Sequence, residues 1–190
     1  MKHAIKKTGL YVATAIALAF GCASAAQAAT VSWTDWTNTS AAASQVFGDL
    51  DINGAHVGVT FTGAYAFAQT TGGTNYWSPA APYLSSLAGN APPASDIIAL
   101  STGGTATITF SQPVVDPLIA LVSWNGNTVD FGVPIEVLSY GSGYWGNGTP
   151  VLNPTSTGFF GNGEVQRRGV GTAGDLAPPP REHPAGGMLG

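Results

Sequence analysis

The chain has 190 residues and a mass of 19.2 kDa, which suits one domain of ordinary size and leaves no room for a second catalytic domain. Only 8% of its residues are charged, and residues 30–163 contain no Lys or Arg but seven carboxylates: Asp35, Asp49, Asp51, Asp96, Asp116, Asp130 and Glu136. Because binding to a phosphate backbone needs basic side chains, this stretch is not expected to bind nucleic acid.

The first 29 residues have the three parts of a secretory signal peptide. Three lysines lie within Met1–Lys7, an uncharged and mostly apolar run follows from Gly9 to Phe20, and Ala26-Gln27-Ala28 forms an Ala-x-Ala cleavage site. We therefore expect a mature chain that starts at Ala29 or Thr30 and is secreted, to the periplasm or the extracellular space. No membrane span is expected in that mature chain.

A rival interpretation of the leader is acylation of Cys22, as in a lipoprotein, although the bulky Phe20 fits that processing site poorly. Cys22 is the single cysteine of the chain. Cleavage after Ala28 removes it, so disulfides and thiol chemistry are not expected in the mature protein.

Residues 30–163 show the pattern of short strands separated by turns. Val57, Val59 and Phe61 alternate with small polar residues, as do Ala106, Ile108 and Phe110, so each run would bury one face and expose the other. No stretch has convincing helical periodicity. The predicted fold is all-β, an antiparallel, jelly-roll-like β-sandwich of roughly eight strands.

Two hairpins are predicted from Asn-Gly pairs that can supply the positive φ angles of a type I′ turn. The first joins Gln45–Ile52 to Ala55–Phe61, and the second joins Leu118–Trp124 to Thr128–Val133. The run Leu118–Trp124 is nearly continuous apolar sequence, which indicates a central strand that is covered on both faces.

Aromatic residues gather in two segments with little strand pattern. One is the long segment 69–95 and the other is the Gly-rich stretch around residues 140–145. Their rings could stack on sugar rings, or they could instead fill the ends of a sandwich. The candidate ligand-binding residues are Tyr76, Trp77, Tyr83, Tyr144 and Trp145, with Tyr140 beside them.

Residues 164–190 differ in composition from the domain before them. They contain six Gly and four Pro, no aromatic residue, and all three Arg of the chain: Arg167, Arg168 and Arg181. A disordered tail would explain this composition. A slipped reading frame near residues 165–167 would also explain it, and the β-sandwich would then lack its last strands. The sequence leaves both alternatives open.

The signal, the strand set and the lack of basic residues resemble secreted proteins of Gram-negative bacteria that carry the PEP-CTERM sorting signal. The resemblance covers roughly residues 1–163 and is carried by four stretches: residues 32–37 (SWTDWT), 72–77 (GGTNYW), 93–100 (PASDIIAL) and 108–123. It implies a protein of the cell envelope associated with exopolysaccharide. Family members end in a Pro-Glu-Pro motif, an apolar span and a basic cluster, and residues 177–182 (APPPRE) do not match that motif.

Other chemistry is weakly indicated. Asp49, Asp51 and Asn53 match the first half of a calcium loop, but Thr60 stands where a bidentate acid is needed and Asn53-Gly54 already suits a turn. His56 is expected to be a solvated strand histidine, on the opposite face from the core. No catalytic site, metal site or cofactor is predicted.

The expected function is therefore non-enzymatic contact with extracellular polysaccharide or envelope proteins. A carbohydrate-binding module is the first alternative. A polysaccharide-degrading enzyme that uses Glu136 with an Asp partner is the second, although an acid on an edge strand also discourages aggregation.

Overall fold

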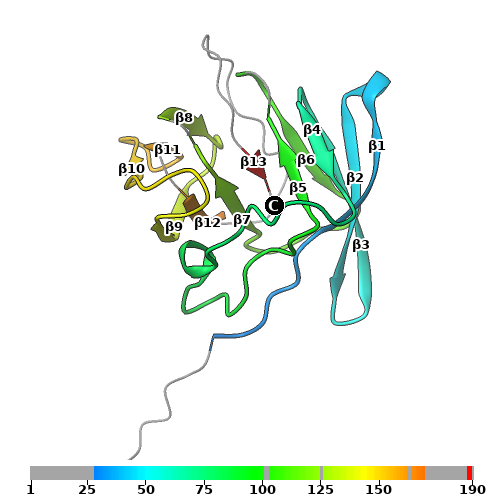
Figure 1. The fold of residues 1–190 in the computed structure, drawn as a ribbon, viewed down its shortest axis with the longest axis horizontal. Helices are drawn as coiled ribbons and strands as arrows, with labels where there is room; N and C mark the ends of the chain where they lie inside the picture. Colours follow the sequence, from blue (N-terminus) through cyan, green and yellow to red (C-terminus); the bar gives the residue numbers. More distant parts are fainter. Residues whose placement is uncertain (1–27, 101–102, 125, 162–163, 170–187, 190) are drawn as a thin grey trace, which may run out of the picture.

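The computed structural model describes residues 28–100, 103–124 and 126–161 in full, and the backbone of residues 164–169 and 188–189. Most of the expected signal peptide and of the expected tail lie outside these residues. The described part consists of antiparallel strands, turns and two short 3-10 helices, η1 (Ala41–Ala43) and η2 (Ala81–Tyr83) (Figure 1). The prediction of an all-β, antiparallel protein is confirmed. No helix in this part is long and apolar enough to cross a membrane.

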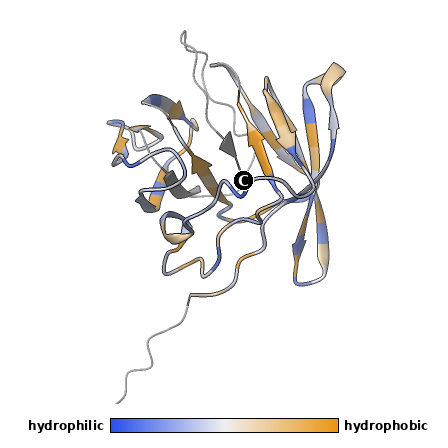
Figure 2. Cartoon of the chain, viewed as in Figure 1, coloured by the Kyte–Doolittle hydropathy of each residue, from blue (hydrophilic) through white to orange (hydrophobic). Residues whose placement is uncertain are grey.

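A four-stranded sheet contains the first predicted hairpin. Its strands lie in the order β1 (Asp35–Ser40), β2 (Gln45–Ile52), β3 (Ala55–Thr62) and β6 (Thr107–Phe110). Ile52 pairs with Ala55 across a two-residue turn in which Asn53 has φ 55° and Gly54 has φ 87°. These are the angles that a type I′ turn requires. The predicted turn and hairpin are confirmed, and Figure 2 shows the polar character of this end of the hairpin.

A six-stranded sheet lies beside it. The order is β4 (Phe67–Gln69), β5 (Ile97–Ala99), β13 (Met188–Leu189), β7 (Leu118–Val122), β12 (Glu164–Gly169) and β9 (Ile135–Gly141). Two of these strands come from the stretch predicted as a tail, and both pair with β7. Strand pairing thus continues past residue 163. The tail and frame-slip alternatives both remain predictions.

The second predicted hairpin is wrong. The third sheet has the order β10 (Val151–Leu152), β11 (Gly158–Gly161) and β8 (Asn127–Asp130), so β8 pairs with β11 and not with β7. Directly after β7, Ser123 adopts φ 52°, a left-handed conformation that ends the extended strand. Asn127 N then donates a hydrogen bond to Trp124 O at 2.8 Å. The next strand, β8, belongs to the three-stranded sheet.

Strand β7 is covered on both faces, as its continuous apolar sequence predicts. Ile119 and Leu121 belong to the larger buried cluster, whereas Ala120 and Val122 belong to a smaller one. Successive side chains of a strand point to opposite faces, so the two clusters lie on the two sides of the six-stranded sheet. Burial of an aliphatic side chain such as Leu121 contributes about 1.5–3 kcal/mol.

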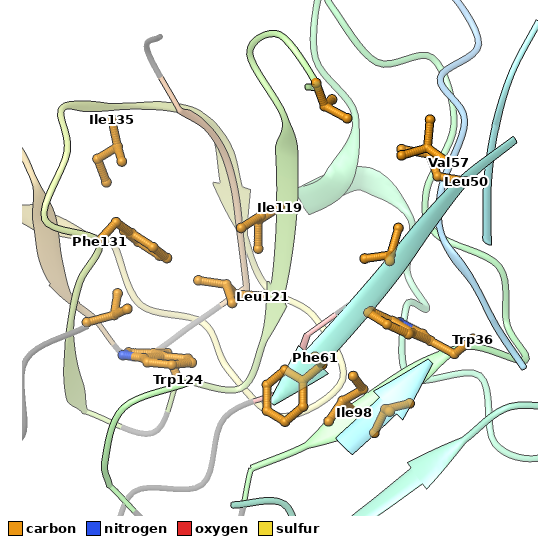
Figure 3. Close-up of a cluster of buried hydrophobic side chains, with 14 of the residues drawn as sticks. Trp36, Leu50, Val57, Phe61, Ile98, Ile119, Leu121, Trp124, Phe131 and Ile135 are labelled. Carbon is orange, nitrogen blue, oxygen red and sulfur yellow. The ribbon is translucent and has the colours of Figure 1, made fainter. Parts of the chain in front are cut away.

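The larger cluster joins all three sheets. It contains Phe61 from the four-stranded sheet, Ile98 and Leu121 from the six-stranded sheet, and Val129 and Phe159 from the three-stranded sheet. Figure 3 shows its labelled members as one row of side chains, from Ile135 and Phe131 at one side to Val57 and Leu50 at the other.

The smaller cluster explains the long segment between β4 and β5. Within the predicted segment 69–95, only Gln69 belongs to a strand, as the last residue of β4, yet Trp77 and Tyr83 from this segment pack with Ile97, Ala120 and Val122. The segment therefore covers the second face of the six-stranded sheet. It is itself held to the start of the described chain by Asn90, whose side chain accepts from Val31 N at 2.7 Å and donates to Val31 O at 3.0 Å.

Candidate functional site

Three of the five candidate aromatic residues meet at the surface. The ring centroids of Tyr76 and Trp145 are 5.0 Å apart and their planes differ by 30°. Tyr144 meets Tyr76 at 5.1 Å and Trp145 at 4.5 Å, edge to face in both contacts. Phe67 extends the group, with its centroid 6.2 Å from Tyr76. We call these four residues the aromatic cluster.

The aromatic cluster is assembled from segments that are far apart in the sequence. Phe67 lies on β4 and Tyr76 lies in the long segment that follows it. Tyr144 and Trp145 are the two central residues of a tight turn after β9, in which Gly143 N donates to Gly146 O at 2.9 Å. Three segments of the chain therefore contribute to the aromatic cluster.

A second set of contacts brings this turn to the long segment. Ser139 Oγ on β9 donates to Pro82 O at 2.6 Å. Where β9 ends, a Cβ on Gly141 would lie 3.6 Å from Pro82 Cγ, which is ordinary van der Waals distance. Because η2 packs against β9 in this way, the turn at residues 143–146 comes within reach of Tyr76.

The aromatic cluster presents apolar rings to solvent. Trp145 is 50% exposed, Tyr144 43% and Phe67 40%, while Tyr76 lies half-buried beneath them. Large aromatic side chains are normally more buried than this. A group of adjacent exposed rings indicates a binding surface, because each ring that a ligand covers is removed from water.

The other two candidate residues do not belong to this surface. Trp77 is 2% exposed and Tyr83 is fully buried, and their rings pack edge to face at 5.1 Å. Trp77 Nε1 donates to the backbone oxygen of Asp96 at 2.9 Å. Their assignment as ligand-binding residues is therefore corrected: they are core residues that hold the long segment on the sheet. Tyr140 is exposed on β9 but makes no contact that places it in the cluster.

Phe67 was missed from the sequence. It stands in the alternating run Tyr65, Phe67, Gln69, a pattern that predicts a short strand but not which face is buried. Tyr65 packs against the larger buried cluster, whereas Phe67 faces Tyr76. In the sequence, the only indication that Phe67 belongs to the cluster is that it closely precedes the aromatic-rich segment 69–95.

His56 is exposed, and its ring contacts the carboxylate of Asp49. Its Nδ1 lies 2.6 Å from Asp49 Oδ2, across the β2–β3 hairpin. The hydrogen bond to Asp49, and then the charges of Asp49 and Asp51, raise the pKa of His56 above its ordinary value. The solvated position predicted from the alternation is confirmed, and the partner fixes the orientation of the ring.

The acidic residues of the same hairpin are engaged in its turn. Asp51 Oδ1 accepts a hydrogen bond from Gly54 N at 2.6 Å, and Asp49 holds His56. No group of three or more His, Cys, Asp or Glu side chains that could hold a metal ion occurs among the described residues. The turn predicted at Asn53-Gly54 is confirmed, and the calcium site stays an alternative prediction.

Glu136, the candidate acid of the enzyme alternative, is exposed on β9, an edge strand of the six-stranded sheet as described. It follows the buried Ile135 in the strand alternation and points away from the core. Its position suits an acid that protects an edge strand.

Comparison of the chain with models of known protein families, with characterised proteins and with solved structures gives no match.

Proposed function

We propose that this protein is an exported, non-enzymatic polysaccharide-binding protein, and that the aromatic cluster is its binding surface. The observation that carries the proposal is the packing of Tyr144 and Trp145 against Tyr76 with about half of each outer ring in solvent. Sugar rings present apolar C–H groups to the electron-rich faces of aromatic rings, while their hydroxyls stay in water. Pre-positioned rings lose little conformational entropy when such a ligand binds.

Two further features support this proposal. The leader sequence at residues 1–29 directs the chain to a compartment where polysaccharide is abundant, and the resemblance to PEP-CTERM proteins implies an association with exopolysaccharide at the cell envelope. We also propose that the four- and six-stranded sheets form the two layers of a β-sandwich, because both contribute to the larger buried cluster.

The enzyme alternative has less support. Glycoside hydrolysis needs two carboxyl groups about 5–10 Å apart on either side of the scissile bond. Glu136 is exposed on an edge strand of the six-stranded sheet, a position that suits an acid protecting that edge.

The proposal is tested by affinity electrophoresis of the exported protein in gels that contain soluble polysaccharides. We expect migration to be retarded by at least one of them, and Trp145→Ala to weaken binding by about tenfold or more, since an anchoring Trp commonly contributes at least 1.4 kcal/mol.

Phe160→Ala is the matched control. Phe160 is an equally exposed aromatic residue, at 54%, but it lies on β11 in the three-stranded sheet. Its removal should leave retardation unchanged. Equal loss of binding in both variants, or retention of binding in Trp145→Ala, would contradict the proposal.

A further inference from the structure

We infer that the aromatic cluster accepts a single uncharged polysaccharide chain in solution, and neither an acidic polymer nor the flat surface of a crystalline one. This inference rests on the proposed function and adds the chemical class of the ligand. It is carried by two observations: the angles between the rings, and the absence of Lys and Arg from residues 30–163.

The rings of the aromatic cluster are not coplanar. Tyr144 is turned by 78° from Trp145 and by 67° from Tyr76, and only Tyr76 and Trp145 are close to parallel. A flat solid could therefore lie against the face of Tyr144 or of Trp145 but not against both. A single chain has no such constraint, because one sugar ring can enter the corner that the two perpendicular rings form.

The lack of Lys and Arg in residues 30–163 disfavours an acidic ligand. All four rings are uncharged, and residues 30–163 carry seven carboxylates with no Lys or Arg. With His56 neutral, the formal charge of this stretch is −7. Within residues 30–163, a uronate or sulfate group would find no Lys or Arg side chain to pair with.

The arginines of β12 stand at the other end of that strand. Arg167 pairs with Val137 and Arg168 with Glu136, whereas Glu164 pairs with Gly141, the residue at which β9 leads into the turn of Tyr144 and Trp145. Val137 and Gly141 are four positions apart along β9, which corresponds to about 13 Å. The β12 residue nearest to the aromatic cluster along β9 is thus an acid.

The test compares a soluble neutral glucan, a soluble neutral galactomannan, sodium alginate and crystalline cellulose as ligands for the exported protein. Binding to the soluble polymers is measured by affinity electrophoresis at low and at high NaCl concentration, and binding to cellulose by co-sedimentation. We expect binding to a neutral soluble polymer, with a change of less than about twofold between the two salt concentrations, because no charge pair is involved. Binding should be lost in Trp145→Ala and kept in Phe160→Ala.

The outcomes separate this inference from the proposed function. Trp145-dependent binding to alginate that falls with added salt, or Trp145-dependent sedimentation with cellulose, overturns the inference but leaves the proposed function standing. Binding that is insensitive to Trp145→Ala, or no binding to any of the four polymers, counts against both.

Discussion

Asp96 combines deep burial with incomplete hydrogen bonding. The residue is 2% exposed, Ser95 Oγ donates to its Oδ2 at 3.0 Å, and its Oδ1 has no partner among the described residues. Burial is the main cause that raises the pKa of Asp96 above the usual Asp value, against the opposing effect of the hydrogen bond from Ser95. The folded state thus binds the proton of this carboxyl more tightly than the unfolded chain does.

The sign of the pH dependence follows from this shift. The stability contributed by Asp96 is fully present below the pKa of the unfolded state, about 3.9, and is lost as the pH rises through the higher pKa of the folded state. Asp96→Asn keeps the shape of the side chain and removes its charge. We expect the urea midpoint of this variant to equal or exceed that of the wild type at neutral pH, with the difference shrinking toward about pH 4. A variant that is less stable than the wild type at neutral pH would contradict this account.

At the scale of the strands, β11 lies very close to β8 at one glycine. A Cβ on Gly158 would collide with the backbone oxygen of Val129 and would lie 2.7 Å from Asp130 Cα. Both obstacles are backbone atoms of the paired strand, so they cannot move aside as the end of a flexible side chain would.

Gly158→Ala should therefore destabilise the protein by about 1–3 kcal/mol, the usual cost of inserting a methyl group into a packed interior. Gly58→Ala on β3 is the control, because its Cβ would meet only Ser111 Oγ at 3.5 Å. Urea unfolding of both variants measures the difference. If Gly158→Ala unfolds at the same urea concentration as Gly58→Ala, then β11 does not pair with β8 in this register.

Features set by neighbouring residues could be predicted from the sequence. The β2–β3 hairpin is specified by alternation on both sides of Asn53-Gly54, and the double burial of β7 is specified by its continuous apolar run. The partner of β8 could not be predicted, because β11 follows it by about 30 residues and nothing local selects it. The positive φ of Ser123, which separates β7 from β8, is likewise imposed by the folded chain.

Contacts between distant residues also explain why the sequence predicts only some members of the aromatic cluster. Tyr76 and Trp77 are adjacent and of similar chemistry, yet Trp77 is buried against Tyr83 while Tyr76 meets Trp145 at the surface. The sequence identifies aromatic-rich segments. Which rings fill the core depends on how residues 70–96 lie on the six-stranded sheet, and that packing is a property of the tertiary structure.

For the molecule as a whole, the proposed binding surface depends on the complete fold. The aromatic cluster draws on β4, on the long segment after it and on the turn after β9. The long segment is held by the smaller buried cluster, which in turn includes two residues of the central strand β7. The protein is thus expected to lose carbohydrate binding whenever this packing is lost, at or below the denaturant concentration that unfolds it.

The most direct test of the aromatic cluster is an NMR titration of the five tryptophan indole N–H signals with a soluble neutral polysaccharide. All five tryptophans lie in residues 30–163, and of these Trp36, Trp77 and Trp124 are buried whereas Trp145 is half exposed. Binding at the aromatic cluster predicts a shift or broadening of the Trp145 signal at ligand concentrations that leave those three buried indoles unchanged. Saturable binding in which the Trp145 signal stays fixed would contradict it.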